Sequence, residues 1–117
     1  ARKFKKIVKR TLFIDNDNNK IRGEDAIISL RNNNDRIIYH IRFHLVDGIS
    51  YNFTNSKKNV ILKTKSKNIW IFKSDIELVI EDSIYVDNNK TIPTKQIVIK
   101  GVINNIKQTR KWSLEKQ

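Results

Sequence analysis

The amino-acid sequence predicts an all-β fold, an antiparallel β-sandwich of about nine short strands, with residues 1–117 in one domain. Runs of β-branched and aromatic residues recur at a spacing of about 8–12 residues, and most of them end in clusters of Asn, Asp, Ser or Gly. No segment sustains the apolar period of an amphipathic helix. We therefore expect no helix longer than about two turns.

The first half of the chain is expected to hold five strands, at 9–14, 21–30, 36–45, 49–54 and 60–63. Turn clusters at 15–19 and 31–35 separate the first three. Gly23 interrupts the second strand and predicts a β-bulge there. Asp47 and Gly48 are the strongest hairpin signal, a tight turn between the third and fourth strands.

Four further strands are expected at 69–72, 77–86, 94–103 and 110–114. Polar clusters at 55–59, 66–68 and 87–90 mark the turns before or between them. Asp82 and Ser83 interrupt the long strand 77–86 and predict a kink or turn there. The basic segment 1–6 is expected to fray.

The third strand has the clearest alternation. Its odd-numbered residues, Tyr39, Ile41, Phe43 and Leu45, are apolar, whereas His40, Arg42 and His44 lie between them. Because successive side chains of a strand point to opposite faces, this pattern predicts one buried face and one polar face. The polar face carries two imidazoles and a guanidinium, which suits an anionic partner.

The charge of the whole chain points the same way. Lys and Arg number 24 against 12 Asp and Glu, a net charge of +12. This balance favours a polyanion partner such as an acidic polysaccharide, although AT-rich codons would also produce a surface rich in Lys and Asn. Cysteine is absent, so disulfides and thiolate metal sites are excluded and periplasm and cytoplasm both stay open. No apolar run approaches the length of a membrane span, so we expect no membrane partner.

The candidate ligand-binding residues are Arg42, His44, His40 and Lys95, all for contact with an anion. The alternative for the strand 39–45 is a plain solvated face. His40 and His44 are about 13 Å apart on a strand, too far for both to bind one zinc ion easily. We therefore expect no metal site and no cofactor.

Catalytic groups are not evident in the sequence. Glu24 and Asp25 are adjacent, as are Glu81 and Asp82, so the members of each pair face opposite ways on a strand. There is no glycine-rich phosphate loop and no local signature of a serine nucleophile. The aromatic residues are expected to pack in the core, with sugar stacking as the functional alternative; they include Tyr51, Phe53, Trp70 and Trp112.

A series of motif-like segments runs along the chain. Ile21 to Asp25 is close to the pattern L-x-G-E-D, Ile41 to Leu45 to I-R-F-H-L, and Trp112 to Leu114 to W-x-L. Further segments of this kind are 10–14, 47–49, 68–72, 80–85 and 96–101. In the same order and at similar spacing, they resemble the C-terminal part of heparinase II/III-like proteins, polysaccharide lyases common in alphaproteobacteria.

The resemblance implies an antiparallel β-sandwich that follows an α/α-toroid in a larger protein. It also implies cleavage of acidic, uronic-acid glycans by β-elimination, in which a base removes the C5 proton and an acid assists the leaving oxygen. The family's catalytic tyrosine and histidines precede the matched part, and no segment here corresponds to them. The expected function is thus a non-catalytic portion of a lyase, with the missing toroid of its parent chain and an acidic polysaccharide as partners.

The alternative function is a free-standing basic β-domain that binds nucleic acid or another polyanion, although the basic and aromatic residues are not interleaved as RNA binding requires. Structure can separate the two. A lyase fragment should expose an apolar edge or face where the missing part packs. An autonomous domain should be closed, with its charge gathered in one groove.

Overall fold

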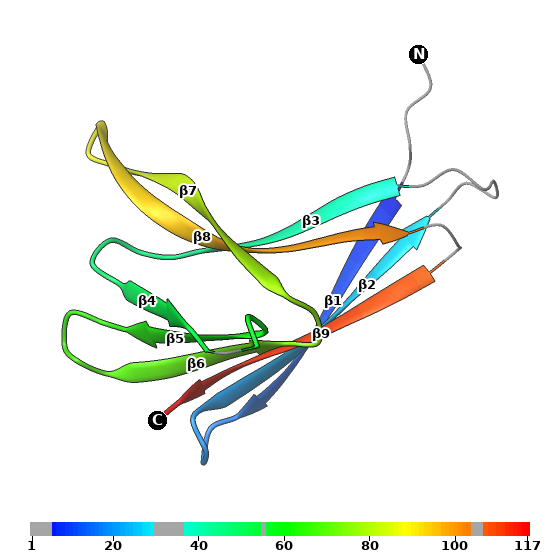
Figure 1. Cartoon of the computed structure of the whole chain (residues 1–117), viewed down its shortest axis with the longest axis horizontal. Coiled ribbons are helices and arrows are strands. Elements are labelled where there is room, and N and C mark those ends of the chain that lie inside the picture. Colours follow the sequence, from blue (N-terminus) through cyan, green and yellow to red (C-terminus); the bar gives the residue numbers. More distant parts are fainter. Residues whose placement is uncertain (1–5, 30–36, 55, 104–106) are drawn as a thin grey trace.

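The computed structural model describes residues 6–29, 37–54, 56–103 and 107–117, and in these ranges the chain is all-β with no helix. Figure 1 shows the arrangement. Since these ranges contain no helix, none there could cross a membrane. The strands are β1 (Lys6–Asp15), β2 (Lys20–Ser29), β3 (Ile37–His44), β4 (Ser50–Phe53), β5 (Asn59–Lys63), β6 (Ile69–Ser74), β7 (Leu78–Asp87), β8 (Lys90–Ile103) and β9 (Lys107–Lys116). All nine expected strands are confirmed, and the expected all-β sandwich with them.

The strands form two antiparallel sheets that pack face to face (Figure 1). Sheet A has six strands in the order β1-β2-β9-β6-β5-β4, and sheet B has three in the order β3-β8-β7. Short turns join β1 to β2, β5 to β6 and β7 to β8. In the last of these, Asn88 and Asn89 both have positive φ, as the type I′ hairpin turn requires.

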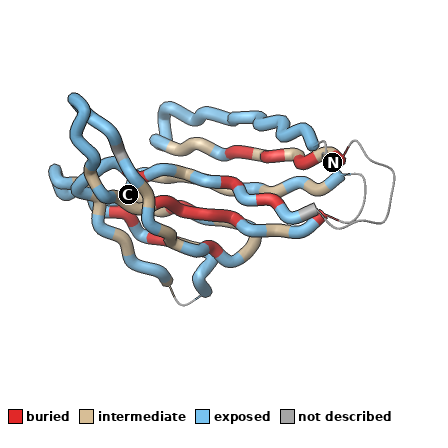
Figure 2. The backbone as a smooth tube through the Cα atoms, turned by 90° about the horizontal axis from the view of Figure 1, so that it is seen from above, coloured by how far each residue is buried: buried red, intermediate tan, exposed pale blue. Residues whose placement is uncertain are grey.

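The core lies between the sheets, where apolar side chains of alternating strand positions meet. Its fully buried members include Ile27 of sheet A and Ile97 and Ile99 of sheet B. Red segments in Figure 2 mark these buried positions. The third strand has the predicted inward face: Tyr39, Ile41 and Leu45 are buried. Phe43 is only partly buried and packs at the margin of the core.

The Asp47-Gly48 signal predicts the turn correctly but the hairpin wrongly. A turn does form there, with Gly48 at φ 86°. However, β3 belongs to sheet B and β4 to sheet A, so the turn carries the chain from one sheet to the other. A turn motif fixes a local change of direction, whereas pairing depends on which faces the following strands must bury.

Two other local predictions are wrong. Gly23 pairs in regular register with Leu12 and Trp112, so there is no bulge. Its lack of a side chain instead makes room, because a Cβ there would lie 2.2 Å from the indole of Trp112. Asp82 and Ser83 lie within β7 in unbroken pairing with β8, so they form no kink or turn. The turn predicted at 31–35 lies outside the described residues, as does most of the basic segment 1–6, of which Lys6 begins β1.

Sheet A is wider than sheet B, and β1 is left uncovered. Every residue of β1 is exposed, as Figure 2 shows. Val8, Leu12 and Ile14 face inward, because they pair with the inward positions Ile27, Gly23 and Ile21 of β2. They are nevertheless 50%, 50% and 64% exposed. Three strands do not span the inner face of six, so an apolar strip of β1 stays open to water.

Candidate functional site

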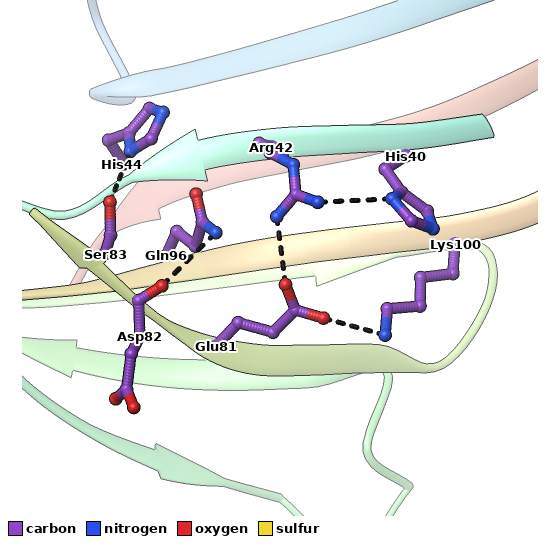
Figure 3. Close-up of polar contacts among 8 residues, drawn as sticks. All are labelled: His40, Arg42, His44, Glu81, Asp82, Ser83, Gln96 and Lys100. Atoms are coloured by element: carbon purple, nitrogen blue, oxygen red, sulfur yellow. Dashed lines mark hydrogen bonds and ion pairs between the residues drawn. The ribbon is translucent and has the colours of Figure 1, made fainter.

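The outward face of β3 carries His40, Arg42 and His44, and all three are exposed as expected. Figure 3 shows them beside residues of β7 and β8. Arg42 donates from Nη1 to Oε1 of Glu81 at 2.9 Å, and Lys100 Nζ lies 2.7 Å from Oε2 of the same carboxylate. Glu81 thus joins two cations from two different strands.

The two histidines have polar partners on this face. His40 Nδ1 accepts a hydrogen bond from Nη2 of Arg42 at 3.2 Å, and His44 Nδ1 lies 2.9 Å from Oγ of Ser83 (Figure 3). Val98 lies in the middle of the same face, paired with Arg42, yet it is fully buried. The long side chains that bridge the strands therefore shield the centre of sheet B from water.

The electrostatics limit what this face can bind. A hydrogen bond from Lys100, and then one from Arg42, hold the pKa of Glu81 below its ordinary value, so the carboxylate stays ionised. Its negative charge neutralises part of the positive charge that the sequence suggested. Among the described residues, no three His, Asp or Glu side chains gather as the ligands of a metal ion would.

Lys95 does not join this group. It pairs with Asp82 on the opposite face of sheet B, and its ammonium contacts that carboxylate. The hydrogen bond to Asp82 raises the pKa of Lys95. In Figure 3 the carboxylate of Asp82 points away from the other labelled side chains, while the backbone oxygen of Asp82 accepts from Gln96. The structure therefore brings together three of the four candidate residues and adds Glu81 and Lys100 to them.

A second polar constellation was missed by sequence reasoning. Asp25 is completely buried on the inner face of sheet A, where it faces Arg10 of β1. Arg10 donates from Nε to Oδ1 at 2.7 Å and from Nη2 to Oδ2 at 2.8 Å. These bonds raise the pKa of the guanidinium. The signal was present in the register: Asp25 alternates with Gly23 and Ile27 on an inward face, where a carboxylate needs a cation.

Aromatic rings surround this ion pair. The guanidinium carbon of Arg10 lies 5.0 Å from the ring centroid of Phe43 and 5.3 Å from that of Trp112. Phe43 in turn packs on Phe72 and Trp112 at centroid distances of 4.9 and 4.8 Å. We call Arg10, Asp25, Phe43, Phe72 and Trp112 the ion–aromatic cluster. It joins β1, β2, β3, β6 and β9, so it ties sheet B to sheet A.

The chemistry of this arrangement is that of a scaffold. The carboxylate of Asp25 is held by a guanidinium, which does not give up its proton in proteins, so the pair is unsuited to proton transfer. The members of the ion–aromatic cluster come from five of the segments that resemble heparinase II/III-like proteins: 10–14, 21–25, 41–45, 68–72 and 112–114. Five of the eight motif-like segments therefore meet in space at one packed cluster.

One known family matches most of the chain. A family model described as Heparinase II/III-like, C-terminal matches residues 1–113. No curated protein and no solved structure matches the chain. Because the family match takes in nearly all of the sequence, the chain belongs to the heparinase II/III-like C-terminal family.

Proposed function

We propose that this chain is the non-catalytic, C-terminal β-sandwich portion of a polysaccharide lyase that cleaves acidic, uronic-acid glycans by β-elimination. Family membership supports the class of protein. The observation that carries the proposal further is the uncovered strip of β1, because it is the apolar face that a lyase portion needs and a closed, autonomous domain lacks.

The strip lies where further strands would fit. β3 is an edge strand of sheet B, and its Phe43 contacts Arg10 of β1. A strand added beside β3 would therefore lie over β2 and β1 and would cover Val8, Leu12 and Ile14. Burying apolar surface contributes roughly 25 cal/mol for each Å², so three such side chains favour a permanent neighbour. We assign that neighbour to the rest of the parent protein.

A supporting role also fits the polar groups. The Arg10–Asp25 ion pair and the Glu81 network are satisfied by their own partners, and neither presents an unpaired acid or base to a substrate. Anionic glycan contacts by His40, Arg42 and His44 are part of the proposal, although Glu81 weakens them. Lys95, on the other face, would make its contact separately.

The test joins the chain to the reading frame upstream of it. The joined protein should release unsaturated, ultraviolet-absorbing product from a uronic-acid polymer, and the chain alone should release none. Sustained activity of the pure chain would refute the non-catalytic role. An upstream frame without a helical toroid would refute the lyase assignment and favour the free-standing polyanion-binding domain.

A further inference from the structure

The outer face of sheet A has a hollow that is lined by none of the expected site residues. One row of side chains crosses four neighbouring strands there, because Phe13 pairs with Arg22, Arg22 with Ser113, and Ser113 with Lys73. Ser113 is short, so the row dips at its centre between longer side chains. The hollow has a volume of about 290 Å³ and Lys111 of the adjacent row also lines it. This volume suits one or two sugar residues.

The walls of the hollow are positively charged. Four cationic side chains line it, those of Lys20, Arg22, Lys73 and Lys111, against two carboxylates, those of Glu24 and Asp75. The formal charge of the lining is therefore +2. An anion entering the hollow would be attracted by its walls as well as by the net charge of the whole chain.

Three of these cations have no carboxylate partner. Lys20 forms an ion pair with Glu115 at 3.5 Å. Asp75 forms an ion pair with Arg110 at 3.7 Å and accepts a hydrogen bond from the backbone N–H of Lys111. Within the described ranges, no carboxylate lies at ion-pair distance from the side chains of Arg22, Lys73 or Lys111. This distinguishes the hollow from the outer face of sheet B, where Glu81 holds both Arg42 and Lys100.

An aromatic ring stands at one side of the hollow. Phe13 is 42% exposed, and the guanidinium carbon of Arg22 lies 5.2 Å from its ring centroid. A second hollow of about 330 Å³ adjoins the first and shares Phe13, Lys20 and Arg22 with it. Together the two hollows form a groove along the end of sheet A, as a chain-like ligand requires.

We propose that this groove is a binding subsite for an acidic polysaccharide, with a carboxylate- or sulfate-bearing sugar residue in the first hollow. Lys73 and Lys111 bind the anionic group. Arg22 contacts the polysaccharide between the two hollows. The apolar face of a sugar ring packs on Phe13. The inference rests on the proposed function for its ligand class, while the groove itself is independent of any catalytic activity.

The chemistry favours a glycan over a nucleic acid. Proteins that hold single-stranded nucleic acid stack successive bases on several aromatic side chains. The groove offers one outward-facing ring, that of Phe13; Trp112 also lines it but projects to the inner face with Gly23 and Phe72. Isolated anionic groups on a saturated ring need cations and a single apolar platform, and the groove supplies both.

The test measures binding of a heparin hexasaccharide and an alginate hexasaccharide to the chain by calorimetric titration at low and high salt. The critical variant is Lys73→Gln with Lys111→Gln. The matched control is Lys63→Gln with Lys107→Gln, which removes the same charge from exposed positions of the same outer face that do not line the hollow. A circular dichroism spectrum confirms that each variant is folded.

We expect the Lys73 and Lys111 variant to weaken hexasaccharide binding roughly tenfold, which is about 1.4 kcal/mol, since two exposed ion contacts are lost together. The control should weaken it less than about twofold, and both effects should shrink as salt screens the charges. Phe13→Leu should weaken both hexasaccharides but leave the binding of free sulfate unchanged.

Equal losses in the variant and its control would show diffuse charge attraction and overturn the subsite. Tighter binding of a single-stranded oligonucleotide of the same charge would overturn the glycan assignment. If glycan binding fails while the joined protein is an active lyase, the subsite alone is wrong. If binding follows the expected pattern while the joined protein is inactive, the lyase assignment fails and the groove stands.

Discussion

Removal of Arg10 is the sharpest test of the ion–aromatic cluster. The change is Arg10→Met, which keeps a long apolar side chain against Phe43 and Trp112 and removes the guanidinium. What it leaves behind is the carboxylate of Asp25, which is 0% exposed and loses both of its charge-assisted hydrogen bonds. The loss of stability therefore reports the cost of an unpaired buried charge.

The magnitude follows from the exposure of the two partners. Leaving one member of a buried ion pair alone typically costs about 3–5 kcal/mol. The side chain of Arg10 is 41% exposed, so water can reach the position it vacates and part of that cost is recovered. We expect Arg10→Met to lower the free energy of unfolding by about 2 kcal/mol.

Urea denaturation followed by tryptophan fluorescence measures this loss. The matched control is Arg22→Met, because Arg22 also lies over an aromatic ring but has no carboxylate partner among the described side chains. It should change stability by no more than about 0.5 kcal/mol. Combining Arg10→Met with Asp25→Val should restore most of the stability, since the buried charge is then gone. Equal losses for Arg10→Met and Arg22→Met would refute the reasoning.

Three further outcomes follow from the packing and the ion pairs. Phe43→Ala should lower the free energy of unfolding, measured by urea denaturation, by about 2–3 kcal/mol, because the ring is only partly buried. Arg42→Ala should lower it by less than half of that, and a larger loss for Arg42→Ala would overturn the face assignment. Gly23→Ala should lower the free energy of unfolding by about 1–3 kcal/mol and change the fluorescence of Trp112, because the added Cβ would overlap the indole. An unchanged fluorescence spectrum and an unchanged stability would contradict the close contact. The pKa of Glu81 is lowered in the folded chain, so its stabilising effect is present above the ordinary value of 4.5 and is lost as the pH falls through the lower folded value. The difference in unfolding free energy between the native chain and Glu81→Gln should accordingly narrow as the pH falls below 4.5. A difference that widens in acid would contradict the expected direction of the pH dependence.

Strand positions could be predicted from the sequence because their signals are local. Asn-rich and Asp-rich turns and β-branched runs mark each strand within a few residues. Sheet membership could not be predicted, as Asp47 and Gly48 show. The same turn could equally well join two strands of a hairpin. What places β3 in sheet B is packing, because Tyr39 and Ile41 are buried against sheet A from the opposite layer.

The arrangement of the candidate residues could be predicted only where it depends on local signals within one strand. Alternation along one strand correctly places His40, Arg42 and His44 on a common outward face. Alternation alone cannot relate Lys95 to them, because that needs the register of β8 against β3. The partnership of Arg10 and Asp25 likewise depends on the register of β1 against β2. Side chains that meet across strands are beyond a reading of single segments.

The order of sheet A also bears on when the protein can fold. β9 is the last strand in the chain, yet it lies between β2 and β6 and joins the pair β1-β2 to the set β4-β5-β6. Pairs such as Ile21 with Leu114 link distant parts of the chain, which slows folding. During synthesis sheet A cannot close until β9 has emerged, so the nascent chain holds two unjoined half-sheets with open edges. Chaperones that shield such edges would matter most for this domain in that interval.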